Sequence, residues 1–191
     1  MMDLFQALES SGFSMLLKEN STIYVAILAF HTIGLSFLVG ISGTTALRIL
    51  GVAPSIPLRP MKGFFPLMWA GFWINAFTGS LLLCLYPTDY FVDVSFYIKI
   101  VCVVTAIVLV RKMQATIFGN DVDTDVAAET GEARNLAKLM LVVWLVATVT
   151  GRVMAYSIPT KVQTGLAVVI FLGVALLVGK FAGRRLGLTA S

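Results

Sequence analysis

The segment from Ser21 to Ile49 is an apolar stretch without one acidic residue, and it is long enough to cross a lipid bilayer as a single helix. Further apolar segments of about 20 residues or more follow it. In hydrocarbon each helix must satisfy its own backbone polar groups, so this pattern specifies an all-α, polytopic membrane helical bundle. We predict a transmembrane domain over residues 21–185, with five transmembrane helices at roughly 21–49, 62–86, 95–113, 136–157 and 162–183.

The composition excludes an ordinary soluble domain. Hydrophobic residues make up 58% of the chain and charged residues only 13%, whereas soluble domains are about a quarter charged. The net charge of +4 does not indicate a nucleic-acid partner, because most of the basic residues lie in short loops beside apolar spans. The partner that this composition predicts is the lipid bilayer.

The basic residues also predict the orientation of the chain. One side of the membrane receives ten lysines and arginines near span ends, and the other receives only Lys18 and Lys161. Positive loops stay in the cytoplasm, so we expect the N-terminus outside and the C-terminus inside. The ten are Arg48, Arg59, Lys62, Arg111, Lys112, Arg134, Lys138, Lys180, Arg184 and Arg185.

Two segments fall outside the predicted spans. Residues 1–20 place apolar side chains near one helical face, which predicts a short amphipathic helix on the membrane surface. Residues 114–134 are polar and predict an extended cytoplasmic loop.

Polar groups within the spans predict a pocket. His31 is the only histidine of the chain and lies ~15 Å below the outer surface, at nearly the level of Asn75. Lys99 and Arg152 lie shallower, at ~6–8 Å. Ionisable groups within a span usually face a protein interior or a cavity. We therefore expect one polar pocket in the outer half of the bundle, with His31 and Asn75 as its floor. Lys99 and Arg152 form its mouth, and Thr78 lies between the two levels.

The predicted pocket suits an anionic ligand. The predicted spans contain no carboxylate, which excludes a proton relay of Asp, Glu and His. Haem b is the leading candidate, because its iron takes a histidine nitrogen and its propionates need cationic partners. In this hypothesis His31 binds the iron. Lys99 and Arg152 hold the propionates. Asn75 and Thr78 orient the imidazole or the ligand.

Other interpretations of the same residues stay open. His31 and a methionine are also ligands that a copper site uses. Without a cofactor, His31 is an interhelical hydrogen-bonding residue, for example to Asn75, and both cations extend to the headgroups. Because each chain has one histidine, the second axial ligand of a haem would be a methionine or a histidine of another subunit, or it would be absent.

Two predicted spans share a local pattern. Trp73 and Trp144 are each followed by a Thr-Gly pair whose glycine lies six or seven residues later, Thr78–Gly79 and Thr150–Gly151. Small residues of this kind are typical of packed membrane helices, and an internal duplication is the alternative explanation.

A resemblance rests on short motifs of the first three spans. They are H-x-x-G at His31 and Gly34, R-I-L-G from Arg48 before a proline-rich loop, the pair Thr78–Gly79, and Lys99. Together they resemble small bacterial inner-membrane proteins of the copper-resistance protein D type. The resemblance implies an inner-membrane module linked to copper or, through b-type cytochrome bundles, to haem. Of the site residues, His31 and Lys99 carry over. The chain departs from these proteins in lacking a methionine- or histidine-rich outer segment and further bundle histidines.

The expected function is therefore haem binding or electron transfer in the bacterial inner membrane. The spans hold no acid–base pair for hydrolysis or group transfer, which favours a role other than that of an enzyme. The alternatives are a copper-handling protein and a cofactor-free structural or assembly subunit. The glycine-rich fifth span offers a surface for a homo-oligomer or a larger membrane complex.

Overall fold

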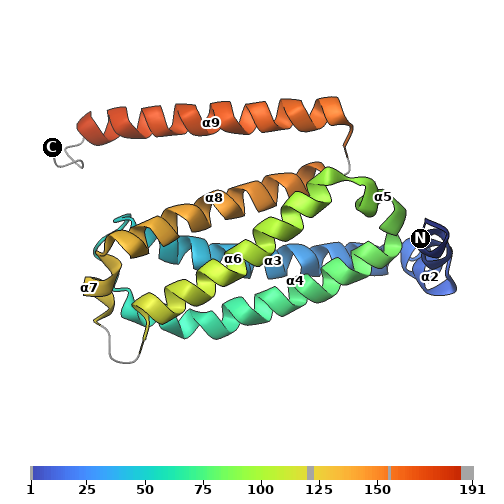
Figure 1. Ribbon diagram of the computed structural model, residues 1–191, viewed down its shortest axis with the longest axis horizontal. Helices are drawn as coiled ribbons and strands as arrows, with labels where there is room; N and C mark the ends of the chain where they lie inside the picture. Colours follow the sequence, from blue (N-terminus) through green and yellow to red (C-terminus); the bar gives the residue numbers. More distant parts are fainter. Residues whose placement is uncertain (1, 120–122, 155, 186–191) are drawn as a thin grey trace.

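A computed structural model describes residues 2–119, 123–154 and 156–185 of the chain (Figure 1). Most residues in these ranges are helical, and none of them lies in a strand. The elements are α1 (Met2–Glu9), α2 (Gly12–Glu19), α3 (Ser21–Ile49), the 3-10 helix η1 (Arg59–Phe64), α4 (Phe65–Leu85), α5 (Pro87–Val92), α6 (Val94–Ile117), α7 (Thr124–Ala128), α8 (Gly131–Val153) and α9 (Ile158–Arg185).

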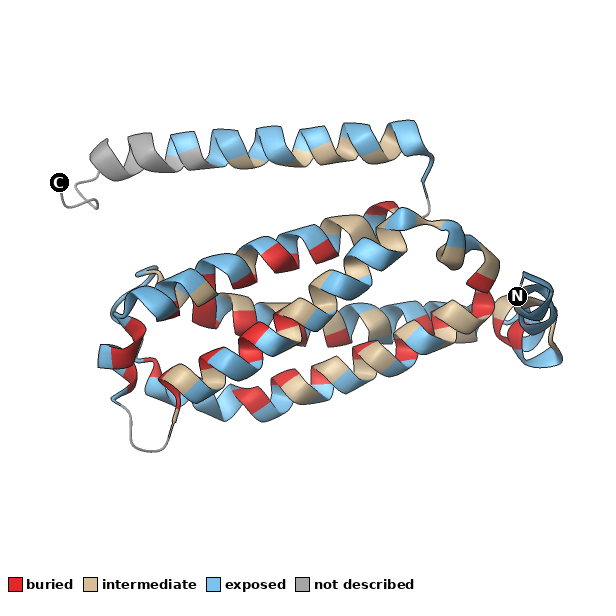
Figure 2. Cartoon of the chain, viewed as in Figure 1, coloured by how far each residue is buried: buried red, intermediate tan, exposed pale blue. Residues whose placement is uncertain are grey.

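Five of these helices are long and apolar enough to cross a membrane, which confirms the predicted fold class. They are α3, α4 together with η1, α6, α8 and α9. Exposed side chains cover much of their outer surface in Figure 2, and many of these are large and hydrophobic. Lipid is the solvent that such a surface requires. The chain is a multi-pass membrane protein.

The two ends of the bundle are called here the Tyr90 end and the Arg48 end. The Tyr90 end holds α1, α2, α5 and the connection from α8 to α9 (Figure 1). The Arg48 end holds η1 and α7, together with the last turn of α3.

The segment 114–134 is more helical than predicted. Helix α6 continues to Ile117, and α8 begins at Gly131, five residues earlier than expected. The side chain of Thr130 caps α8 by accepting a hydrogen bond from the backbone N–H of Ala133. Between them, α7 is held to α3 by an ion pair of 3.5 Å between Arg48 and Asp125.

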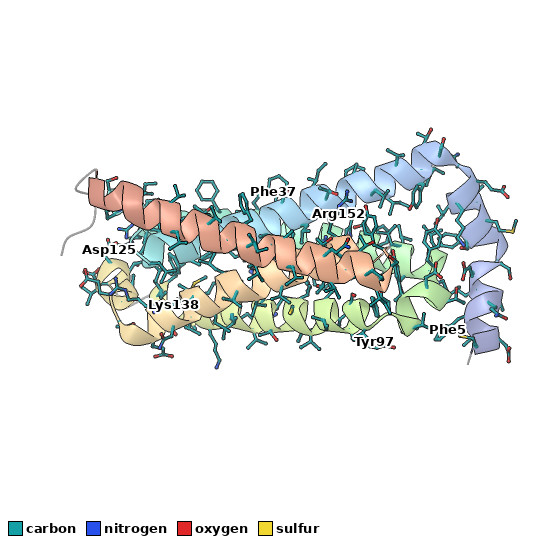
Figure 3. All side chains as sticks on the ribbon, turned by 90° about the horizontal axis from the view of Figure 1, so that it is seen from above. Phe5, Phe37, Tyr97, Asp125, Lys138 and Arg152 are labelled. Atoms are coloured by element: carbon teal, nitrogen blue, oxygen red, sulfur yellow. The ribbon has the colours of Figure 1, made fainter. Side chains whose placement is uncertain are left out.

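The first 20 residues form two short helices where one was expected. Ser10 and Ser11 interrupt the helix, because the hydroxyl of Ser11 caps α2 by accepting from the N–H of Ser14. Figure 3 shows α1 and α2 lying across the Tyr90 end of the bundle, perpendicular to its long axis. Glu9 fastens them there by accepting hydrogen bonds from Lys18, at 3.1 Å, and from Thr88 of α5.

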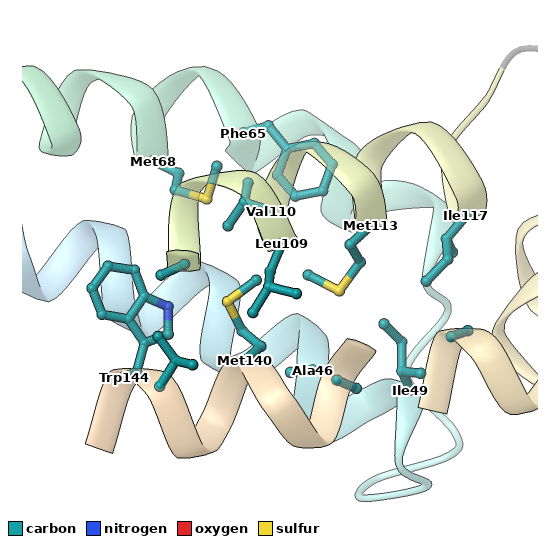
Figure 4. Packing of buried hydrophobic residues seen from close by; sticks show 14 of the residues in the cluster. Ala46, Ile49, Phe65, Met68, Leu109, Val110, Met113, Ile117, Met140 and Trp144 are labelled. Atoms are coloured by element: carbon teal, nitrogen blue, oxygen red, sulfur yellow. The ribbon is translucent and has the colours of Figure 1, made fainter. Parts of the chain in front are cut away.

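Helices α3, α4, α6 and α8 pack around one core, which is densest towards the Arg48 end (Figure 4). Helix α3 packs on α4 and α8, and α6 packs on α8, whereas α4 and α6 have almost no direct backbone contact. Near the Arg48 end their side chains still meet, as between Phe65 and Phe118, whose rings lie 4.9 Å apart. Towards the Tyr90 end α4 and α6 diverge (Figure 1).

Helix α9 lies apart from this four-helix core, beyond α8 and on the side away from α4 (Figure 1). Its described part buries none of its membrane-spanning window inside the protein. An ion pair of 2.6 Å between Lys161 and Asp93 joins its first turn to the start of α6.

Candidate functional site

His31 is held at the interface of α3 and α4. Its Nδ1 lies 3.0 Å from Oγ1 of Thr78. The backbone is fixed as well, because Nδ2 of Asn75 donates a hydrogen bond of 2.8 Å to the carbonyl oxygen of His31. Asn75 and Thr78 are both buried, and His31 is half-buried. The imidazole is therefore anchored through one side of its ring.

The hydroxyl of Thr78 determines which ring nitrogen of His31 remains free. Its Oγ1 lies 2.7 Å from the carbonyl oxygen of Ile74, to which it donates as threonines in helices commonly do. We assign the proton to Nδ1 and the lone pair to Nε2, because Thr78 then accepts from the ring at 3.0 Å, whereas the donor Nδ2 of Asn75 lies farther from Nδ1, at 3.4 Å. Among the described residues Nε2 has no hydrogen-bond partner. This arrangement, in which a partner holds one ring nitrogen and the other is free, is typical of metal-binding histidines.

Two glycines make room for the two polar side chains of the site. The ring of His31 lies on Gly79 of α4, where a Cβ would come within 3.2 Å of Cε1. The side chain of Lys99 on α6 lies across Gly151 of α8, where a Cβ would come within 3.3 Å of Cδ and Cε. These are the glycines of the two Thr-Gly pairs. In each pair of packed helices, one helix supplies the polar side chain and the other supplies the glycine beneath it.

His31, Asn75 and Lys99 line one pocket of about 270 Å³ in the Tyr90-end half of the bundle. The remaining wall is mostly apolar. It consists of Phe72, Ala76, Gly79, Ser80, Leu82, Leu83, Tyr90, Phe96, Ile100, Val103 and Met154. Within the described part of the chain, Lys99 makes no hydrogen bond or ion pair, and no carboxylate lines this pocket. The structure thus brings together His31, Asn75, Thr78 and Lys99.

Arg152 is not part of this group. It is exposed and does not line the pocket, although its neighbour Gly151 lies against Lys99. Successive residues of a helix point about 100° apart, so the packing of Gly151 against Lys99 turns Arg152 away from that side chain. The sequence-based prediction treated these two neighbours as one face. The pocket therefore has one cation where two were expected.

A second and larger pocket of about 830 Å³ lies at the Tyr90 end. Tyr90 and Met154 line both pockets, so the outer one adjoins the inner one. Its wall combines tyrosines with Asp89, Asp93 and the paired Lys161. Sequence reasoning missed Tyr90 and Met154, because a short helix and a helix end bring them to the site.

The donor set around His31 fits haem b in part. The free Nε2, the hydrogen-bonded Nδ1 and a cation in the same pocket are what a haem iron and one propionate require. The inner pocket is somewhat smaller than the ~300–1,000 Å³ of small-molecule sites, so a porphyrin has to extend beyond it. A site built from three or more His, Cys, Asp or Glu side chains is not present in the described residues.

No family model, curated protein or solved structure matches this sequence significantly. The resemblance to proteins of the copper-resistance protein D type therefore stays a prediction from short motifs. The class of protein, a multi-pass helical membrane protein, rests on the five apolar helices.

Proposed function

We propose that this protein binds an anionic metal cofactor, with haem b as the leading candidate, in the pocket that His31 and Lys99 share. The observation that carries the proposal is the free Nε2 of His31 beside a lysine that has no partner in the described structure. Haem b would supply a one-electron redox centre, and electron transfer or haem binding is the role that follows.

Each side chain has a separate task in this proposal. His31 would bind the iron through Nε2, and the hydroxyl of Thr78 would keep the ring in the required tautomer. Asn75 would hold the backbone of α3 at that point by its bond to the carbonyl oxygen of His31. Lys99 would face one propionate, because an ammonium group at this depth is costly without an anion.

A second residue of the chain would help to hold the iron. Met68 and Met140 are completely buried in the core, whereas Met154 lines the pocket with His31. A thioether that holds the iron together with a histidine would raise the reduction potential of a bound haem. We assign this role to Met154. A Met154→Leu variant should then retain haem but change its ferric spectrum and lower its potential.

The proposal includes the orientation of the protein in a bacterial inner membrane. Arg48, Arg59 and Arg134 all lie near helix ends at the Arg48 end. This supports a cytoplasmic Arg48 end and an external Tyr90 end. A reporter fused after Ser191 should be active only in the cytoplasm, and activity on the outside would contradict this orientation.

The test of the cofactor is an absorption spectrum of the full chain, purified in mild detergent and titrated with hemin. A Soret band should appear and should be lost in His31→Ala. Lys99→Met should weaken binding, whereas the matched variant Arg152→Met should not, because Arg152 is outside the pocket. Size-exclusion profiles show whether each variant keeps its fold. A wild-type protein that binds no haem would contradict the proposal.

Metal analysis separates haem from copper. His31 and Met154 offer the nitrogen and sulfur ligands that Cu(I) accepts. Copper that is lost in His31→Ala, together with the absence of a Soret band, would favour the copper-handling alternative.

The packing of α9 favours a second candidate, a structural role in an assembly of copies of this chain. None of its membrane-spanning window is buried within the protein, whereas the windows of α3, α4, α6 and α8 are partly buried. Cysteine cross-linking between copies in native membranes should trap dimers through α9 if this is correct. If cross-linking traps only monomers, α9 is surrounded by lipid and the structural role is contradicted.

A further inference from the structure

The pocket of His31 and Lys99 lies between α4 and α6, which diverge towards the Tyr90 end. Helix α4 supplies one wall and α6 supplies the other, and these two helices have almost no direct backbone contact. Side chains bridge the space nearer the Arg48 end, where Phe65 meets Phe118 and Arg111 lies over the ring of Trp69. Helix α9 lies beyond α8, away from α4, and does not cover the gap (Figure 1).

The rim of this gap is accessible from outside the protein. Two lining residues, Ser80 on α4 and Ile100 on α6, are exposed. Ile100 is six residues into α6, which places it ~9 Å along a membrane-spanning helix. At that depth the surroundings are lipid tails and not water. The side opening of the pocket therefore faces the hydrocarbon layer.

We infer that the pocket takes a carboxylate-bearing amphiphile, which enters sideways from the bilayer between α4 and α6. The inference uses the pocket of the proposed function, and haem b, an apolar ring with two propionates, belongs to the same chemical class. A long-chain fatty acid is the other source of this chemistry.

The chemistry of the wall supports this class of ligand. Lys99 is the one cation among the described lining residues, and no lining carboxylate competes for it. Nε2 of His31 can accept a hydrogen bond from a carboxylic acid or bind a metal. The path from these two groups to the rim is lined by Phe72, Ala76 and Ile100, which suit an apolar tail or ring. A small water-soluble anion has no apolar part that could contact these side chains.

The test uses the full chain in phosphatidylcholine liposomes with a palmitic acid that carries a diazirine beside its carboxyl group. After irradiation, mass spectrometry should find saturable labelling on residues 72–83 of α4 and 96–103 of α6. Excess palmitate should displace this label, whereas acetate should not. Lys99→Met should lower the saturable label at least fivefold, and Arg152→Met should leave it unchanged.

A second pair of variants tests the route. Ala76→Phe narrows the opening and should lower both fatty-acid labelling and hemin uptake from liposomes at least fivefold. Ala70→Phe is the control, because Ala70 is exposed on the same helix and does not line the pocket.

Failure of this inference can be distinguished from failure of the proposed function. Unsaturable labelling, together with hemin binding that Ala76→Phe leaves unchanged, would overturn the inference and retain the cofactor. Saturable fatty-acid labelling without any Soret band would support the inference and overturn the haem proposal.

Discussion

The imidazole of His31 on α3 lies on Gly79 of α4, and a Cβ at position 79 would come within 3.2 Å of its Cε1 atom. A Cβ at this distance would be closer to its neighbour than most Cβ atoms in real proteins are. The ring has little freedom to move away, because Thr78 holds its Nδ1 atom and Asn75 holds the backbone carbonyl oxygen of His31. A glycine is therefore part of the geometry of the site, although it contributes no chemistry.

The first prediction concerns this glycine. Gly79→Ala should displace the imidazole by a few tenths of an ångström and weaken haem binding about tenfold, as other changes around metal ligands do. Hemin titration measures the effect. Gly43→Ala is the matched control, since its Cβ would come no closer than 4.0 Å to Leu141. Equal affinities of the two variants would show that the glycine is not needed to position the ring.

The second prediction concerns the tautomer of His31. Thr78→Val removes the oxygen that accepts from Nδ1 and should lower haem affinity roughly 10–100-fold. Thr150→Val is the control from the other Thr-Gly pair. Among the residues that the structure describes, the hydroxyl of Thr150 bonds to Val146 and Ala147 of its own helix alone. If both variants bind hemin as the wild type does, Thr78 has no role in orienting the ring.

The third prediction concerns the close packing of α3 on α4. A Cβ at Gly34 would come within 2.7 Å of the carbonyl oxygen of Gly71, and backbone cannot move away as a side chain can. Gly34→Ala should therefore destabilise the protein by ~1–3 kcal/mol. Gly40→Ala should leave stability unchanged or slightly raised, because its Cβ meets nothing within 4 Å and alanine favours a helix. Thermal denaturation in detergent provides the comparison, and equal midpoints would contradict this packing.

The fourth prediction is a pH dependence at the start of α9. Burial raises the pKa of the Asp93 carboxyl, but hydrogen bonds from Lys161 and Ser95 outweigh it and hold the pKa below the ordinary 3.8. A carboxyl with a lowered pKa stabilises the folded state above its unfolded pKa, and this stabilisation is lost as the pH falls through the folded pKa. The Lys161–Asp93 attachment should be complete at pH 7 and lost only as the pH falls through the folded pKa, which lies below 3.8, at a cost of at most ~1 kcal/mol.

Hydrogen exchange of residues 158–165 can follow this attachment. Asp93→Asn should show the fast exchange already at pH 7, because asparagine can still cap α6 but cannot pair with Lys161. Slow exchange of that variant at pH 7 would show that the ion pair does not hold α9.

Much of the fold could be predicted because the bilayer imposes it. In a hydrocarbon layer a long apolar segment must form a helix to satisfy its backbone hydrogen bonds. The helix from Ser21 to Ile49 was therefore predicted with its observed bounds. The segment 114–134 was harder, because in water a polar stretch can be a loop or a helix. There the capping by Thr130 and the ion pair of Arg48 with Asp125 decide the outcome.

For the candidate site, the sequence by itself determined how deep each polar residue lies in the membrane. Only the tertiary structure decided which way each side chain points. Counting residues along a helix of fixed rise placed His31, Asn75 and Lys99 in one half of the membrane. The count does not show how each helix is rotated about its axis, which depends on packing such as that of Gly34 on Gly71. Rotation turned Lys99 into the pocket and Arg152 away from it, and it brought Met154 to the same wall.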